Sequence, residues 1–393
     1  MDVRAVAPGK ARFSFPPIRA GVSLLFLMNG FLVGAWAPKI PEFAERLGLS
    51  KSQLGLMILL IGVGSLCLMP VAGALMAARG SEKVVKVMAV LMVPSLFLLT
   101  MTDQVWTAAI AVIWFGGFMG AMDVAMNTNA VAVERRMGSA IMSSCHAFWS
   151  LGGLIGSATG GLMISWFGVT AHAVAATLAA AGVLAIAWPM VLADAPEQHD
   201  DAPKRRLPLE PLPWIFGMMA LFSMVPEGAV LDWGAFYIRQ ELGASLAASG
   251  FAFAAFSGTM ALMRFGGDIV RNRFGAVKTM RISAVFAIIG MLCAGLAPSS
   301  ALAIAGFALC GLGIANMVPI AFSAAGNIPG LAPGVGMSVA TTMGYSGLLV
   351  APSLIGFTAE HVGFQPVFLF LPILLLTVLL LSRLVKHADR IHQ

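Results

Sequence analysis

Apolar stretches of about 20 residues recur along the whole chain, and they constrain its fold more than any other feature. A helix of roughly 20 residues, rising about 1.5 Å per residue, spans the hydrocarbon core of a bilayer. Only 11% of the residues are charged, against roughly 25% in soluble domains. The sequence therefore predicts an all-α membrane protein.

We count twelve such stretches, six on each side of one long polar segment. Their approximate limits are 20–38, 52–77, 84–101, 105–133, 139–166, 171–192, 213–238, 246–270, 279–297, 301–326, 334–358 and 364–385. The polar segment, ADAPEQHDDAPKRRLPLEP at 193–211, is rich in Pro and charge and lacks apolar periodicity. We expect it to be a cytoplasmic linker between two six-helix bundles, 1–192 and 212–393.

Lys and Arg gather on one side of the predicted membrane. Of the 24 Lys and Arg residues, only Lys39, Arg46, Lys51 and Arg239 fall on the other side, if Arg264 is counted at a helix end. Because cytoplasmic loops carry the excess of positive charge, we expect both termini in the cytoplasm. The expected location is a bacterial inner (plasma) membrane. The net charge of +6 follows from this bias and does not indicate nucleic-acid binding.

Several other classes of function are disfavoured. The four cysteines lie in apolar stretches without metal or disulfide spacing, so we expect no metal site. No GxxxxGK[ST] motif for ATP phosphates appears, and we expect no cofactor. Ser143 or Ser144 beside His146 lacks an orienting acid at a convincing spacing, although Asp123 could supply one. An intramembrane enzyme is therefore not expected.

The two halves resemble each other at matching places. LGLSKSQLG at 47–55 corresponds to LGASLAASG at 242–250, and GAMD at 120–123 corresponds to GIAN at 313–316. Duplicated helical bundles that enclose a site at the bilayer midplane are typical of secondary transporters.

These features make the whole chain resemble the major facilitator superfamily of transporters. RFGGDIVRNRFG at 264–275 keeps the acidic, basic and glycine positions of the family's loop signature, with Asp268, Arg271 and Arg273. The equivalent loop of the first half, GALMAARGSEK, has Ala77 where the acid is expected.

Three motifs resemble one bacterial branch of that superfamily, which is related to the fucose:proton symporters. They are DVAMNTNAVAVERRMGSAIMSSCHAFWSLGG at 123–153, EGAVLDW at 227–233 and GYSGLLVAPSLIG at 344–356. The branch includes the YbjJ-type inner-membrane proteins and the rhizopine transporter MosC. The resemblance implies uptake of a small solute driven by protons.

Asp123 lies inside the fourth stretch, on one helical stripe with Asn127 and Glu134. Low dielectric favours the neutral form of a carboxyl group, so Asp123 can take up and release a proton. The alternative is a structural Asp capped by its neighbours. His146 lies at a matching depth in the fifth stretch, where it either relays a proton or fixes the Asp123 rotamer.

Glu227 lies near mid-bilayer in the seventh stretch, where its counterpart in the first half is the neutral Asn29. Packing symmetry therefore does not demand the acid, which favours a functional role. Pro226 and Gly228 beside it predict a break in the helix, of the kind found around transporter ligands.

The remaining polar and aromatic residues complete the expected site. Proton coupling is assigned to Asp123, Glu227 and His146. Substrate binding is assigned to Asn29, Asn127, Trp149, Asp232, Trp233, Asn316, Thr342 and Tyr345. Gating is assigned to Asp268, Arg271, Arg273 and Arg239, and Asp232 with Arg239 is an alternative gating salt bridge. Gly152, Gly156 and Gly160 form a ridge suited to close helix packing.

Amides and aromatic rings suit a neutral polyhydroxylated ring, and an acid could also hold an amino group. We therefore expect a monomer in the lipid bilayer that takes up a sugar- or inositol-like solute by proton symport. Proton-coupled efflux of drugs or metabolites is the alternative. A transporter-like sensor that binds its ligand without moving it is a third class.

Overall fold

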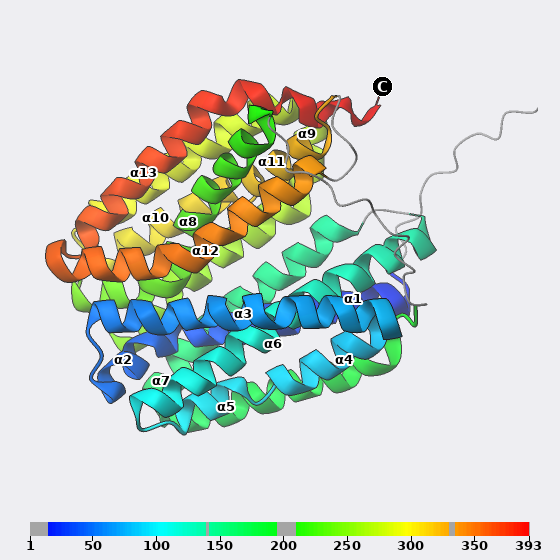
Figure 1. Ribbon diagram of the computed structural model, residues 1–393. Helices are drawn as coiled ribbons and strands as arrows, with labels where there is room; N and C mark the ends of the chain where they lie inside the picture. Colours follow the sequence, from blue (N-terminus) through cyan, green and yellow to red (C-terminus); the bar gives the residue numbers. More distant parts are fainter. Residues whose placement is uncertain (1–14, 139–140, 195–209, 330–334, 393) are drawn as a thin grey trace, which may run out of the picture.

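The structure is a computed structural model that describes residues 15–138, 141–194, 210–329 and 335–392. Within these ranges the regular elements are all helices, most of them long and aligned side by side (Figure 1). A few side chains within the ranges, including that of Asp268, are not described. The predicted linker at 193–211 lies almost entirely outside the described residues, so the domain limits stay a prediction.

The helices follow one another in two sets. The first comprises α1 (Pro17–Trp36), η1 (Ala37–Lys39), α2 (Ile40–Leu47), α3 (Lys51–Arg79), α4 (Ser81–Met92), α5 (Ser95–Thr100), α6 (Val105–Met137), α7 (Met142–Ala187) and η2 (Trp188–Met190). The second comprises α8 (Pro211–Gln240), α9 (Leu246–Gly295), α10 (Ser300–Ile314), α11 (Met317–Gly326), α12 (Val335–Val362), α13 (Phe364–Leu381) and η3 (Ser382–His392). We call these sets the first and second halves.

Eleven helices within the described residues are long and apolar enough to cross a membrane. One of them, Met142–Met190, contains two of the predicted stretches, because Gly168 adopts φ 83° and turns the chain. A positive φ is readily accessible only to glycine. Counting the two segments of α7 separately gives the twelve predicted crossings.

The break predicted at Pro226 is wrong, because α8 continues through it from Pro211 to Gln240. Neighbouring helices in a membrane bundle make a single lost hydrogen bond tolerable. The chain instead breaks between α4 and α5, at Val93 and Pro94, and between α10 and α11, at Ala315 and Asn316.

The two sides of the bundle are distinguished by the chain ends. The termini side holds the start of α1 and the end of η3, and the opposite, far side holds α2 and the turn between α12 and α13 (Figure 1). On the termini side both halves contain the same arrangement of a glycine and an Asp at the start of a helical segment. Gly80 and Gly275 both have positive φ. Asp194 accepts hydrogen bonds from the backbone N–H groups of the two residues after Gly80, and Asp389 accepts from the backbone N–H group of the residue after Gly275.

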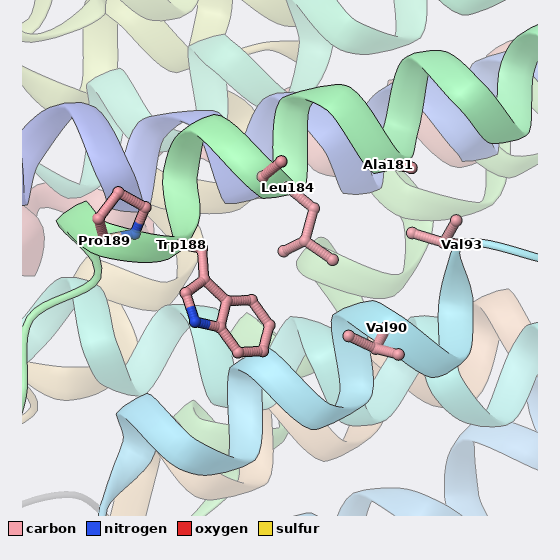
Figure 2. Close-up of a pocket in the computed structure, with 7 residues that line it drawn as sticks. Val90, Val93, Ala181, Leu184, Trp188 and Pro189 are labelled. Atoms are coloured by element: carbon pink, nitrogen blue, oxygen red, sulfur yellow. The ribbon is translucent and has the colours of Figure 1, made fainter.

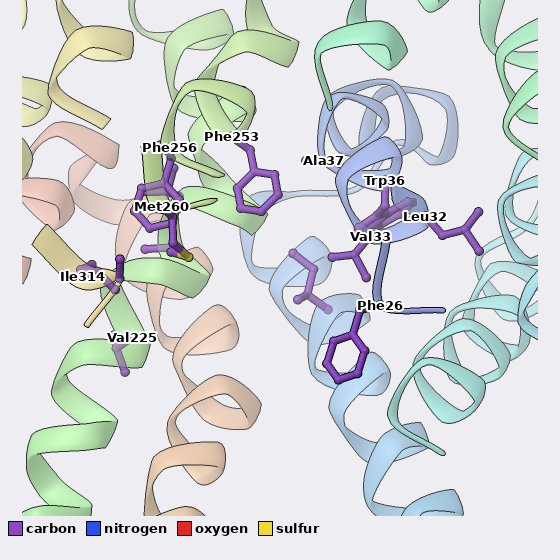
Figure 3. Close-up of a cluster of buried hydrophobic side chains, with 14 of the residues drawn as sticks. Phe26, Leu32, Val33, Trp36, Ala37, Val225, Phe253, Phe256, Met260 and Ile314 are labelled. Carbon is purple, nitrogen blue, oxygen red and sulfur yellow. The ribbon is translucent and has the colours of Figure 1, made fainter. Parts of the chain in front are cut away.

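Buried apolar side chains of both halves form one core cluster, part of which Figure 3 shows. Phe26, Val33 and Trp36 of α1 are buried in the first half, and Phe256 and Met260 of α9 in the second. Within the first half, glycines let α1 and α7 touch. A Cβ at Gly152 would lie 2.1 Å from the Leu27 carbonyl oxygen, and one at Gly156 would lie 2.2 Å from that of Phe31. This contact confirms the predicted glycine ridge.

Gly152→Leu is therefore expected to lower the thermal melting temperature of the purified protein, because overpacking costs about 1–3 kcal/mol. Gly182→Leu is the matched control on the same helix, since a Cβ there meets no atom within 4 Å. A melting curve of Gly152→Leu that overlays that of Gly182→Leu would contradict the close approach.

Candidate functional site

Four ionisable side chains from four helices meet near the middle of the bundle. Asp123 comes from α6, Glu227 from α8, Arg264 from α9 and Tyr345 from α12. An Arg264 guanidinium nitrogen lies 3.8 Å from Glu227 Oε1. Tyr345 interacts electrostatically with Asp123, Glu227 and Arg264. We call these four residues the central cluster.

Arg264 connects the two halves of the protein. Its Nη1 donates a hydrogen bond to Ser150 Oγ of α7 at 2.7 Å. In return, Ser143 Oγ of α7 donates to the Arg264 carbonyl oxygen at 3.2 Å. His146, on the same helix, is an electrostatic neighbour of Arg264. One cation therefore binds a carboxylate of the second half and a hydroxyl group of the first.

The side chains of the central cluster are partly solvent-accessible although they lie between long apolar helices. The side chains of Arg264 and Glu227 are 13% and 19% exposed, and Tyr345 is 44% exposed. Removing ions from water fully costs several kcal/mol each, so partial hydration makes this pair tolerable at this depth.

Asp123 makes its hydrogen bond within its own helix. Asn127 Nδ2 donates to Asp123 Oδ1 at 3.3 Å and to the Asp123 carbonyl oxygen at 2.8 Å. No direct hydrogen bond joins Asp123 to His146 in the part of the chain described. His146 instead packs edge-on against Phe26, with ring centroids 5.2 Å apart. The Asp123 carboxylate therefore keeps acceptor capacity for a proton or a solute.

Asn29 is held by hydrogen bonds to neighbouring protein groups in this conformation. It is buried, and Trp149 Nε1 donates to its Oδ1 at 2.9 Å. Its Nδ2 donates to the Met119 carbonyl oxygen at 3.4 Å. Asn29 is thus shielded from a solute and holds the half-buried Trp149 ring, whereas the sequence predicted direct contact.

The other predicted binding residues are scattered. Trp233 is fully buried beside Phe364, with ring centroids 5.3 Å apart, so it packs toward the far side and cannot reach a solute in this conformation. Asp232 is buried and has no hydrogen-bond or ion-pair partner among the described residues. Asn316 is buried at the break before α11, and its Nδ2 has no described partner. Thr342 is exposed on α12.

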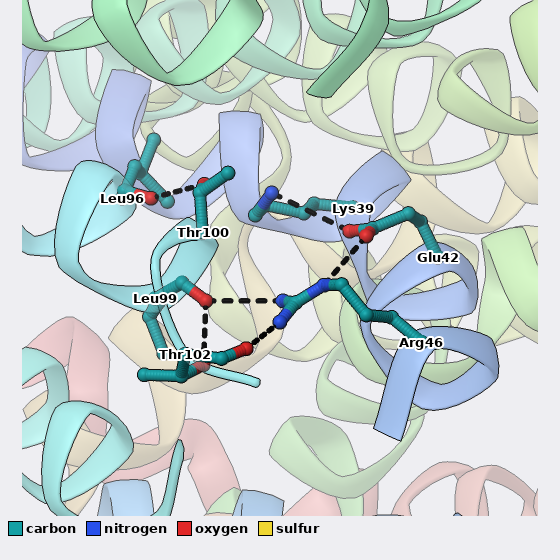
Figure 4. A network of polar contacts seen from close by, with 7 residues as sticks. All are labelled: Lys39, Glu42, Arg46, Leu96, Leu99, Thr100 and Thr102. Carbon is teal, nitrogen blue, oxygen red and sulfur yellow. Dashed lines mark hydrogen bonds and ion pairs between the residues drawn. The ribbon is translucent and has the colours of Figure 1, made fainter. Parts of the chain in front are cut away.

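The predicted gating residue Arg239 joins the halves at the far side. Its guanidinium lies 3.0 Å from Glu45 Oε1 of α2, and not on Asp232 as the alternative had it. Figure 4 shows how α2 is held: Arg46 pairs with Glu42 at 2.8 Å and donates to the carbonyl oxygens of Leu99 and Thr102.

Two further contacts close the same side. Lys51 Nζ of α3 donates to the Ala359 carbonyl oxygen of α12 at 3.1 Å. The Glu360 carboxylate accepts from the Ser52 backbone N–H at 2.6 Å. From this closed end, α3 and α12 diverge toward the termini side (Figure 1).

The other predicted gating residues do not join the halves. Arg271 Nη2 donates to Ser323 Oγ at 3.0 Å, and its Nε lies 3.9 Å from Asp389, so it holds η3 within the second half. Arg273 is exposed and lies over the Phe274 ring. The side chain of Asp268 is outside the described part, so its role stays a prediction.

Sequence reasoning missed Arg264, because it was counted among the cations at a helix end. Two features of the sequence could have indicated that Arg264 belongs to the site. Arg264 lies inside the apolar run of 246–270, and it precedes Gly275 by the same spacing by which the uncharged Met69 precedes Gly80. The same argument from broken symmetry that singled out Glu227 therefore applies to Arg264.

Comparison with known proteins identifies the family to which this architecture corresponds. The family model described as Major Facilitator Superfamily matches residues 22–231 and 218–392. An uncharacterized MFS-type transporter of Yersinia pestis is 35% identical over 97% of this chain and 98% of its own length. The membrane protein MosC of Rhizobium meliloti is 32% identical over 89% of this chain and 86% of its own length.

Solved transporter structures share the fold at low sequence identity. A point mutant of the nucleoside transporter NupG superposes with a TM-score of 0.72 and 13% identity, covering 93% of this chain and 98% of its own. The human organic anion transporter MFSD10 (TETRAN) gives 0.65 and 16% identity, covering 93% and 100%.

Arg264→Leu is expected to lower the melting temperature more than the double variant Arg264→Leu/Glu227→Leu. The single change leaves Glu227 without its cation, which costs about 3–5 kcal/mol for a fully buried pair and less here because water reaches it. Melting curves of both single variants and the double variant measure this coupling. Strictly additive losses would contradict the Arg264–Glu227 pair.

Arg239→Glu is expected to loosen the far side, because it replaces the cation of the Arg239–Glu45 pair with a carboxylate that repels Glu45. The readout is labelling of Ser353→Cys, in a background without native cysteines, by a maleimide that does not cross membranes. Ser353 Oγ donates to the Gly55 carbonyl oxygen at 3.0 Å across the halves.

Labelling should accelerate in Arg239→Glu and return toward the original rate when Glu45→Arg is added. Arg273→Glu, on the termini side, is the control that should change nothing. Equal labelling rates in all these variants would show that the Arg239–Glu45 pair does not hold the far side closed.

Proposed function

Because this chain belongs to the major facilitator superfamily, a family of membrane transporters and not of enzymes, we propose that it takes up a small polar solute by proton symport. The central cluster carries this proposal, since Asp123 and Glu227 come from opposite halves and share Tyr345 as an electrostatic neighbour. Such an arrangement lets one protonation event act on both halves of the molecule.

The charges of the central cluster support proton coupling. The pair of Arg264 and Glu227 is neutral overall, which leaves the Asp123 carboxylate as the uncompensated charge of the central cluster. An uncompensated charge is unfavourable once water is excluded from the site. Protonation of Asp123 would remove that charge, so closure around a neutral solute would be favoured after the proton has bound.

The arrangement of the halves supports alternating access. With the termini side in the cytoplasm, as the Lys and Arg distribution predicts, the structure would be closed outward. The closing pair of Arg239 and Glu45 is 26% and 54% exposed. Exposed ion pairs contribute only about 0–1 kcal/mol each, so this pair would add little to the cost of opening the far side when solute and proton bind.

The chemistry of the site favours a sugar- or inositol-like solute. Asn127 and Asp123 offer hydrogen-bonding groups on one half, and Thr342 and Tyr345 offer hydroxyl groups on the other. Trp149 adds an aromatic face held by Asn29. We propose a monomer that needs no cofactor, in a bacterial inner membrane with both termini cytoplasmic. A thermal-shift screen against sugars, polyols and amino-inositols would find the solute.

Asp123→Asn is expected to abolish accumulation of that solute driven by a pH gradient, since the amide mimics the protonated acid and cannot release a proton. Solute exchange without a gradient should persist in proteoliposomes. Asp103→Asn, in the exposed turn before α6, is the matched control and should accumulate normally. Full accumulation by Asp123→Asn would refute its role in coupling, and loss of exchange as well would indicate a binding defect.

A further inference from the structure

A groove outside the central cluster lies on the surface of the first half, between α4 and the last turns of α7 (Figure 2). It arises because α4 ends at Met92 and Pro94 redirects the chain into α5, while small residues recur on the facing segment of α7. Its volume is about 490 Å³. The groove is lined by Val90, Val93, Ala181, Leu184, Trp188 and Pro189.

The surroundings of the groove indicate an apolar occupant from the bilayer. Val90 is 48% exposed and Trp188 is 43% exposed, on helices that cross the membrane. In a bilayer, lipid chains would surround this surface, and the groove offers them mainly apolar side chains along its length. An acyl chain fits both the lining and the setting.

The mouth of the groove on the termini side is positively charged. Lys86 Nζ lies 5.1 Å from the centroid of the Trp188 ring and pairs with Glu82 at 2.6 Å. Lys83 is exposed on the same turn of α4, and Arg79 is exposed at the end of α3. The carboxylate of the nearby Asp194 already accepts hydrogen bonds from the first N–H groups of α4.

Trp188 adds a polar group at the same level. Its indole N–H finds no acceptor among the residues that the structure describes, and Trp is enriched where membranes meet water. A phosphate there would accept from the indole and from the neighbouring ammonium groups.

We propose that this groove binds an anionic phospholipid of the leaflet on the termini side. One acyl chain lies along Val90 and Leu184, and the phosphate lies at Trp188 and Lys86. The proposal is independent of the solute and of proton coupling.

The second half supplies matched controls through the repeat. Val285 follows Gly275 by ten residues as Val90 follows Gly80, and it is 42% exposed. Lys278 occupies the position of Lys83, and Arg281, at the position of Lys86, donates to Ser382 Oγ at 3.1 Å. Lys86 is itself paired with Glu82, so the halves differ in what else the cation contacts: Lys86 lies over an indole ring, whereas Arg281 is bound to η3. The lipid site is therefore expected in the first half.

Native mass spectrometry of the full chain in detergent, with added phosphatidylglycerol or phosphatidylcholine, tests the groove. The wild type should retain phosphatidylglycerol preferentially. Val90→Trp fills the groove and should reduce that retention on the order of tenfold, whereas Val285→Trp should match the wild type. Equal retention by the two variants, or equal retention of the two lipids by the wild type, would overturn the proposal.

Lys86→Gln keeps the groove but removes the ammonium group. It replaces Val90→Trp as the test variant if Val90→Trp fails to fold. Its preference for phosphatidylglycerol over phosphatidylcholine should fall roughly fivefold, which is the effect of one cation near a membrane surface. Lys278→Gln should keep the wild-type preference. An unchanged preference in Lys86→Gln would contradict the assignment of the phosphate.

Discussion

The constraint on which the rest of this structure depends is that a charge between apolar helices must find both a partner and some water. Arg264 meets it by pairing with Glu227 in its own half and by donating to Ser150 in the other. Moving either half would therefore disturb the environment of this cation. The stability of the charges in the site therefore depends on the relative position of the halves.

Close glycine contacts occur both within the first half and between the halves. Within the first half, glycines on α7 bring its backbone against that of α1, a contact that tolerates no added carbon. Between the halves, the far side combines an exposed ion pair, which is weak, with close contacts of α7 and α9, where a Cβ at Gly250 would lie 2.6 Å from the Ser157 carbonyl oxygen. A rocking motion about a central site would have to separate these contacts on the far side.

Much of the fold followed from sequence, because a bilayer leaves few choices to an apolar run of helical length. The crossings, the repeat and the glycine ridge were all predicted in this way. The continuity of α8 through Pro226 was not, since it depends on neighbours that a local pattern does not contain. The same pattern could not place the breaks at Pro94 and Asn316.

The site was predicted only in part, for a related reason. Asp123 and Glu227 were recognisable because a buried acid is costly and the repeat did not require it. Whether a polar residue faces a solute or a neighbouring side chain depends on rotation about the helix axis. Asn29 contacts Trp149 and Trp233 contacts Phe364, so these side chains face other side chains of the protein. The most direct test of the account measures proton movement upon solute addition to proteoliposomes. Protons should enter with the solute, and solute entry without protons, or with protons leaving, would contradict it.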